Sequence, residues 1–163
     1  MNPKKILIAV DASDNAARAV DYVAQLLTDT TTFDVTVLYI ERPPNRDFFP
    51  SDAEWIKAGV AQEEHIRAFL EESRQKLAAT GLPQASVNVA YIPHCQSPVH
   101  QSAEFCSLGT SIARDILQFQ QSGGFGTLVI GRRGVSRAEE FLFGSVTTKV
   151  THLAKDCTVW VVQ

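Results

Sequence analysis

The residues with the clearest chemical potential lie between positions 131 and 147, where the chain reads GRRGVSRAEEFLFGSVT. Gly131 and Gly134 are three positions apart, and Gly144 follows after nine intervening residues and directly precedes Ser145. Glycine permits positive φ angles and close backbone approach, and successive backbone amides can form a concave anion site. The first turn of a following helix adds unpaired N–H groups and the positive end of the helix dipole. The pattern therefore predicts a loop that surrounds an anion, with phosphate as the natural occupant.

Polar side chains in the same stretch would strengthen such a site. Arg132 and Arg133 could make charge-assisted contacts with phosphate oxygens, and Ser145 and Thr147 could each donate a hydroxyl hydrogen. These residues also have an alternative interpretation, in which the glycines only shape a connection, the arginines are solvated, and Ser145 is the N-cap of a helix. On these residues alone, both interpretations stay open.

The elements that must position this loop are strands that alternate with helices. Five short apolar runs have the length of buried strands, at 5–10, 35–40, 87–92, 127–130 and 158–162. Apolar residues recur at helical spacing between them: Ala17, Val20, Ala24 and Leu27; then Ile56, Val60, Ile66, Leu70 and Leu77 within about 53–80; then Ile112, Ile116 and Phe119; and finally Val146, Val150 and Leu153. Ser13 is a plausible cap for the first helix. Alternating strands and helices predict an α/β fold with a doubly wound, five-stranded parallel sheet and four helices.

The spacing Gly131-x2-Gly134-x9-Gly144-Ser145, with the apolar strand before it and the Gly-Ser-Val-Thr helix opening, resembles the nucleotide loop of the universal stress protein family. The resemblance covers nearly all of the chain. It implies strand order 3-2-1-4-5, an adenine-nucleotide alpha-hydrolase-like fold and membership of the ATP-binding subgroup. In that order the sheet changes direction between the first and fourth strands, and ligands of open α/β sheets bind at such a switch.

The resemblance also implies roles for particular residues. Asp11 would lie beside the nucleotide, Val10 and Ile40 would line the adenine pocket, and Gly131 would lie by the ribose. Asp11 could instead be a turn former, and Val10 and Ile40 could be ordinary core residues. Because a carboxylate repels phosphate, Asp11 would need to contact the base or ribose, or a Mg²⁺ ion would have to lie between them. The complete implied site is Val10, Asp11, Ile40, Ile130, Gly131, Arg133, Gly134, Gly144, Ser145, Val146 and Thr147, holding ATP, or AMP or ADP, with Mg²⁺.

Other nucleotide folds and efficient catalysis find no support. The stretch 126–133 lacks the Lys-Ser/Thr pair of a P-loop, and the turn after the first strand has no G-x-G-x-x-G. A receiver domain would need an aspartate at the end of the third strand, where this chain has Tyr91, Ile92 and Pro93. Glu139 and Glu140 could orient a water molecule, but adjacent carboxylates in a loop are usually surface charge. Without a positioned base, bound ATP should be hydrolysed slowly at most.

Composition limits the partners and the compartment. At 163 residues the chain predicts one domain, and a net charge of −3 predicts no general attraction to nucleic acid or anionic membrane. The apolar run 6–10 is too short for a signal peptide or a membrane span. Three scattered cysteines argue against a disulfide framework and for a reducing compartment, which predicts a cytoplasmic protein.

Two segments depart from the family's pattern. Residues 93–108, hereafter the insert, lengthen the approach to the third helix, and Cys157-Thr158 replace a proline before the last strand. The insert holds His94, Cys95, His100 and Cys106, but their spacing lacks the close pairs of a zinc site, so we expect a flexible surface loop rather than a metal or redox site.

The sequence supports two main functional hypotheses. The first is an ATP-binding universal stress protein that acts as a homodimeric signalling module, paired through the apolar terminal strand 158–162. The second is a nucleotide-free interaction module in which the insert recruits an unknown protein partner. A slow ATPase or phosphotransfer protein is a further alternative.

Overall fold

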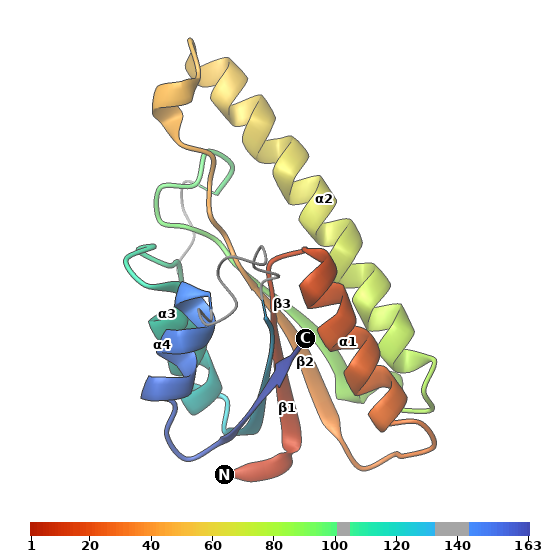
Figure 1. Ribbon diagram of the computed structural model, residues 1–163. Helices are drawn as coiled ribbons and strands as arrows, with labels where there is room; N and C mark the ends of the chain where they lie inside the picture. The colour runs from red at the N-terminus through yellow and green to blue at the C-terminus, as the bar shows by residue number, and fades with distance from the viewer. Residues whose placement is uncertain (101–104, 133–143) are drawn as a thin grey trace.

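The computed structural model describes residues 1–100, 105–132 and 144–163, and Figure 1 shows a central sheet with a pair of helices on each side. The strands are all parallel and lie in the order β3-β2-β1-β4-β5. This order and the α/β fold confirm the expectation. The strands are β1 (Asn2–Val10), β2 (Asp34–Ile40), β3 (Val87–Ile92), β4 (Phe125–Gly131) and β5 (Thr158–Val162); the helices are α1 (Asp14–Leu26), α2 (Asp52–Ala78), α3 (Ile112–Ser122) and α4 (Ser145–Leu153). Short 3-10 turns lie at Arg46–Phe48 and Gln84–Ser86.

The centre of the sheet is β1, which pairs with β2 on one side and β4 on the other. Ile8, for example, lies opposite Val37 of β2 and Val129 of β4. All three side chains have no exposed surface. A strand between two parallel neighbours and two helical layers has no face in water, which explains its continuous apolar sequence.

Each face of the sheet has its own hydrophobic core. Ile8 packs with residues of α1 and α2 such as Val20 and Leu70, whereas its neighbour Leu7 packs with residues of α3 and α4 such as Ile116 and Val150. Successive side chains of a strand point to opposite faces, so one apolar strand supplies both cores. This double burial holds the carboxyl ends of β1 and β4 at fixed positions.

The helix α2 is longer than the sheet that it covers. Its 27 residues span about 40 Å at 1.5 Å per residue, whereas the seven residues of β2 span about 23 Å. Its amino-terminal half therefore extends beyond the sheet, as Figure 1 shows. The apolar residues at helical spacing therefore differ in burial: Ile56 and Val60 are 38% and 39% exposed. Ile66, Leu70 and Leu77 lie over the sheet and are buried.

None of the helices in the described ranges is both long enough and apolar enough to cross a membrane.

Candidate functional site: a cavity between β1 and β4

A cavity of about 280 Å³ opens where the strands β1, β2 and β4 end and the helices α1 and α4 begin. It lies at the point where the strand order changes direction, the usual ligand position in an open parallel sheet. The cavity is lined by Ala9, Val10, Asp11, Ser13, Asn15, Ala16, Leu38, Tyr39, Ile40, Arg42, Gln62, Ile112, Ile116, Ile130, Gly131, Gly144, Ser145, Val146 and Thr147.

Most of the residues expected at a nucleotide site meet at this cavity. Those in its lining are Val10, Asp11, Ile40, Ile130, Gly131, Gly144, Ser145, Val146 and Thr147. The other two, Arg133 and Gly134, lie outside the described residues, as do Glu139 and Glu140. The tertiary structure thus joins the end of the first strand to the start of the last helix, although contact with a nucleotide stays a prediction.

Asp11 shapes the turn between β1 and α1. Its Oδ1 accepts hydrogen bonds from the backbone amide and the hydroxyl of Ser13, at 3.2 and 2.5 Å. Ala12 between them has a positive φ of 57°. The Oγ of Ser13 accepts a hydrogen bond from the amide of Ala16 at 3.3 Å, so Ser13 is the N-cap of α1, as expected. Asp11 is therefore a turn former, the alternative considered above, and it lines the cavity as well.

Gly131 allows close contact between β4 and the first turn of α1. A Cβ atom at this position would lie 2.5 Å from the carbonyl oxygen of Asn15 and 3.1 Å from the amide nitrogen of Ala16. The first distance is well below an ordinary van der Waals contact and involves backbone, which cannot rotate away. A glycine is thus required here by packing, whether or not a ligand binds beside it.

Gly144 has a different role, because its backbone does not require glycine. It is the N-cap of α4, with φ −52° and ψ 151°, and it provides no side-chain hydrogen bond to cap the helix. Thr148 donates the first backbone hydrogen bond of the helix, to the carbonyl oxygen of Gly144 at 2.9 Å. The amides of residues 145–147 precede this donor, so they are the amides that a helix start offers to an anion.

The side chains in the first turn of α4 differ in exposure. Ser145 is exposed and is the first helical residue, so the alternative that it is the N-cap is wrong. Thr147 is 4% exposed and lines the cavity. One hydroxyl is thus available to solvent or ligand, and the other belongs to the cavity wall.

Several lining residues were not anticipated from the sequence. The side-chain amide of Gln62, from the middle of α2, donates a hydrogen bond to the backbone carbonyl of Arg42 at 2.9 Å and lies 3.4 Å from the hydroxyl of Tyr39. Burial raises the pKa of Tyr39 above its ordinary value. Arg42 could have been identified as a lining residue from the sequence, because it comes shortly after the end of a strand that borders the cavity. Gln62 carries no such signal, since its place depends on how α2 crosses the sheet.

A second cavity of about 320 Å³ adjoins the first. The two share Arg42, Ile112, Ser145 and Val146, and the second also reaches His94 and Lys149. Within the described parts of the chain, neither Arg42 nor Lys149 forms an ion pair with a carboxylate. The combined space therefore has positive charge beside the start of α4, which suits an anionic ligand.

The cysteine expectation is wrong, because Cys95 and Cys106 form a disulfide. His94 and Ser107 form an isolated parallel β-bridge, which brings the two cysteine Cα atoms to 4.9 Å although the residues are 11 positions apart in sequence. Linear spacing gave no indication of this pairing. Cys157 is a free thiol whose pKa is raised by burial.

The described part of the insert is also packed, contrary to the expectation of a loose surface loop. Ser97 and Ser107 are 3% and 5% exposed. Pro98 is buried and would contact a Cβ atom added to Gly59 of α2 at 2.5 Å. The insert thus lies against the body of the protein at both of its described ends.

The chain is similar to known proteins over nearly its whole length. The model of the universal stress protein family matches residues 2–163. The universal stress protein YxiE of Bacillus subtilis is 27% identical to the chain over 159 residues, covering 98% of each protein. A universal stress protein solved in complex with cAMP has a TM-score of 0.61 at 18% identity and covers 98% of this chain and 95% of its own. The universal stress protein from Archaeoglobus fulgidus in complex with dAMP has a TM-score of 0.60 at 18% identity, covering 98% and 97%.

Proposed function

Because this chain belongs to the universal stress protein family, we propose that it binds an adenine nucleotide, ATP with Mg²⁺, in the cavity between β1 and β4. As a member of the ATP-binding subgroup, it would act as a homodimeric module that reports nucleotide occupancy during a stress response. The observation that carries this proposal is the meeting of Asp11, Gly131 and the start of α4 at one cavity.

The residues present fit the chemistry of such a ligand. Val10, Ile40 and Ile130 give the cavity an apolar wall suited to the adenine ring, and all three are buried. The first turn of α4 presents amides and the hydroxyl of Ser145 to the phosphates. A volume of about 280 Å³ is near the lower end of ordinary ligand cavities, and the adjoining basic cavity adds room for further phosphates.

The charge of Asp11 restricts where the phosphates can lie. Its Oδ1 is engaged with Ser13 in the turn, and a carboxylate next to a phosphate would be repulsive. Asp11 therefore faces the base or ribose, or contributes an oxygen ligand to Mg²⁺. When bound, Mg²⁺ neutralises phosphate charge. Support for an adenine ligand also comes from the structural neighbours named for complexes with cAMP and dAMP.

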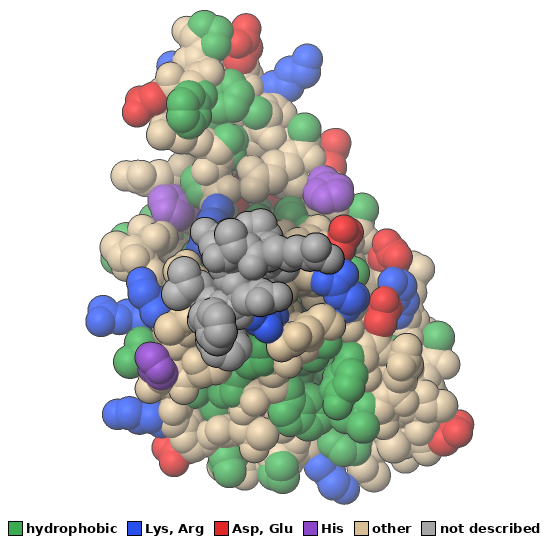
Figure 2. All heavy atoms as spheres, viewed as in Figure 1, with side chains coloured by type: hydrophobic (Ala, Val, Ile, Leu, Met, Phe, Trp, Pro, Cys, Tyr) green, Lys and Arg blue, Asp and Glu red, His purple; other side chains and the backbone are tan. Residues whose placement is uncertain are grey.

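The homodimer is proposed to form through β5. Within the described ranges this strand pairs with β4 alone and ends the strand order, and residues 159–162 are half-buried. Trp160 packs edge-on against Tyr22 of α1, which is 48% exposed, and Leu26 is 50% exposed. Figure 2 shows hydrophobic side chains gathered over β5 and α1. A terminal apolar strand at a sheet edge is a surface that a second copy can cover.

Further parts of the proposal concern location and activity. We place the protein in the cytoplasm, without nucleic acid or membrane as a partner, and with any protein partner unspecified. Hydrolysis of ATP would be slow at most. The competing hypothesis is a nucleotide-free interaction module that uses the same fold and recruits a partner through the insert.

Calorimetry with a matched pair of variants separates these hypotheses. Purified protein is titrated with ATP, ADP and AMP, each with and without Mg²⁺. Gly144→Leu places a bulky side chain at the start of α4, where the backbone accepts any residue. Thr151→Leu places the same side chain on an exposed position of α4 that lines neither cavity. We expect binding in the parent and in Thr151→Leu, and loss of binding in a folded Gly144→Leu protein. No heat with any nucleotide in the parent would favour the interaction module.

A further inference from the structure

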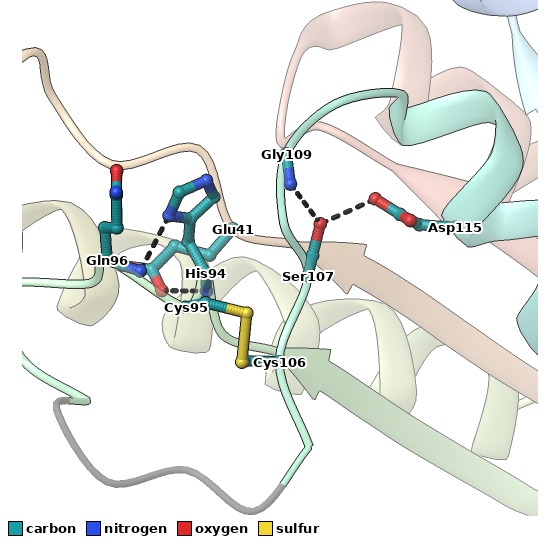
Figure 3. Close-up of a disulfide and its surroundings, with 8 residues drawn as sticks. All are labelled: Glu41, His94, Cys95, Gln96, Cys106, Ser107, Gly109 and Asp115. Atoms are coloured by element: carbon teal, nitrogen blue, oxygen red, sulfur yellow. Dashed lines mark hydrogen bonds between the residues drawn. A yellow bond between two sulfur atoms is a disulfide. The ribbon is translucent and has the colours of Figure 1, made fainter.

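The disulfide joins two segments that run side by side. The amide of Cys95 donates a hydrogen bond to the carbonyl oxygen of Ser107, and the amide of Ser107 donates one to the carbonyl oxygen of Pro93, both at 2.8 Å. Figure 3 shows the disulfide that joins Cys95 of one segment to Cys106 of the other. Two backbone hydrogen bonds and one covalent bond therefore hold the described ends of the insert together.

One of these segments is anchored to the end of β2. The carboxylate of Glu41, which is 4% exposed, accepts a hydrogen bond from the amide of His94 at 2.7 Å and another from the hydroxyl of Ser97 at 2.8 Å. Glu41 lies between Ile40 and Arg42, both of which line the nucleotide cavity. A shift of residues 94–97 would thus displace the buried carboxylate of Glu41 and, with it, the adjacent residues of the cavity wall.

The other segment is anchored to the start of α3. The hydroxyl of Ser107 donates a hydrogen bond to Oδ2 of Asp115 at 2.6 Å and accepts one from the amide of Gly109 at 2.9 Å, as Figure 3 shows. Asp115 lies in the first turn of α3, between the cavity-lining residues Ile112 and Ile116. The disulfide therefore connects two walls of the cavity, one at the end of β2 in the sheet and the other at the start of α3 in a helical layer.

Tight packing completes this connection. A Cβ atom on Gly109 would lie 2.4 Å from Nε2 of His94, so the two segments are also packed against each other away from the disulfide. His94 and Gly109 both line the adjoining basic cavity. Cys95 and Cys106 are themselves half-buried and belong to neither hydrophobic core.

We propose that Cys95 and Cys106 form a thiol–disulfide exchange site whose redox state sets the affinity of the adjoining cavity for its nucleotide. The proposal rests on the function proposed above. Its reductant is a cellular thiol or dithiol, the class of molecule that keeps most cytosolic cysteines reduced. Disulfides of cytosolic proteins are usually transient and either catalytic or redox-sensing, so this argument rests on the cytoplasmic location proposed above.

The exchange reaction balances as follows. A thiolate of the reductant attacks one sulfur of the disulfide, the sulfur–sulfur bond breaks, and a mixed disulfide forms. A second thiolate then attacks this mixed disulfide and leaves with the first reductant as their own disulfide. Two electrons and two protons pass to the protein, which ends with free thiols at Cys95 and Cys106. Oxidation runs the same steps in reverse, with an oxidised dithiol as electron acceptor.

Reduction should weaken nucleotide binding because it loosens a wall that the ligand needs in place. Non-covalent contacts would then have to align the two segments; among the described residues these include the hydrogen bonds to Glu41, Ser107 and Asp115 and the packing of Gly109 against His94. Part of the binding free energy would be spent on ordering them, and we expect a Kd roughly three- to tenfold higher in the reduced protein. By linkage, a saturating nucleotide should make the disulfide harder to reduce by the same factor.

The test uses the full chain in oxidised and reduced form, with ATP and Mg²⁺ as the probe. Kd is measured by calorimetry before and after reduction with dithiothreitol, and the thiols are counted by alkylation and mass spectrometry. The double variant Cys95→Ser/Cys106→Ser should bind with the Kd of the reduced parent, and its Kd should not change when dithiothreitol is added. Cys157→Ser, which removes the free thiol, should keep the full redox response. The disulfide fraction is then measured in graded glutathione buffers with and without nucleotide.

The outcomes separate this inference from the function on which it rests. A weaker Kd on reduction, absent from the double variant and matched by a shift in the glutathione titration, supports the exchange site. Equal Kd values in both redox forms, or a tighter Kd on reduction, overturn it and leave nucleotide binding intact. No binding in either form removes the proposed function and this inference together. Failure of Cys95 and Cys106 to form a disulfide under oxidising conditions overturns the inference alone.

Discussion

A Cβ atom on Gly131 would lie 2.5 Å from the carbonyl oxygen of Asn15, so the end of β4 and the first turn of α1 are in backbone contact. Replacing Gly131 by alanine must push these elements apart at the rim of the cavity. We expect Gly131→Ala to lower the free energy of unfolding by about 1–3 kcal/mol, the usual cost of overpacking. Urea denaturation measures this change. Gly144→Ala is the control and should cost less, because φ at Gly144 is ordinary; equal losses would argue against the contact.

The core around β1 should be sensitive to truncation. Leu128 of β4 has no exposed surface and packs in the core formed with α3 and α4. Leu128→Ala is expected to reduce the free energy of unfolding by about 2–5 kcal/mol, through lost burial and the cavity left behind. Val89→Ala is the comparison, since Val89 is 42% exposed, and it should change stability by no more than about 0.5 kcal/mol. Thermal or urea denaturation of both variants gives the comparison.

Lys149 should contribute to binding through its charge. It lines the basic cavity next to the start of α4, whereas Lys155 lies in the connection after that helix and lines neither cavity. We expect Lys149→Ala to weaken ATP binding by about 1 kcal/mol, or roughly fivefold in Kd, with a smaller effect on adenosine. Lys155→Ala should bind like the parent. Titration at two salt concentrations checks the electrostatic origin, because the loss should shrink at high salt.

Stability should fall at high pH because of Tyr39, which is buried, and Tyr91, which is half-buried. Burial raises the pKa of both Tyr39 and Tyr91 above the ordinary value of 10.0. The folded protein therefore keeps the phenol protons at a pH where the unfolded chain loses them. Their contribution to stability is complete below pH 10 and is lost as pH rises from there through the folded pKa values. Urea denaturation at pH 9 and 11 measures the loss.

Substitution identifies the groups responsible for this pH dependence. Tyr91→Phe should reduce the difference in stability between pH 9 and pH 11, since it removes one titrating group. Tyr22→Phe provides the control, because Tyr22 is 48% exposed. An unchanged difference in Tyr91→Phe would assign the pH dependence to other groups.

The proposed dimer should depend on the exposed surface beside β5. Tyr22→Lys places a charge next to Trp160 without altering the strand itself. We expect the parent to sediment as a dimer at micromolar concentration and the variant to shift toward monomer, because the interface would have to bury that charge. Val89→Lys places the same charge on β3, at the opposite edge of the sheet. A parent that stays monomeric, or a Tyr22→Lys protein that stays dimeric, would count against this interface.

The sequence by itself determined the sheet and most of the candidate site. Continuous apolar runs such as 5–10 and 127–130 are strands because only burial on both faces suits them, and that property is local. The spacing from Gly131 to Ser145 is also local, and it located the start of α4 and the end of β4 correctly. Strand order came from resemblance to a family and was confirmed by the pairing of β1 with both β2 and β4.

Only the tertiary structure decided the features that depend on distant segments meeting. Gln62 lines the cavity because of the way α2 crosses the sheet. Ile56 is exposed because the amino-terminal half of that helix extends beyond the sheet. Cys95 and Cys106 pair because a β-bridge between His94 and Ser107 brings them together. Periodicity and motif spacing describe neighbours along the chain, whereas these contacts are set by packing between layers, so no local pattern could reveal them.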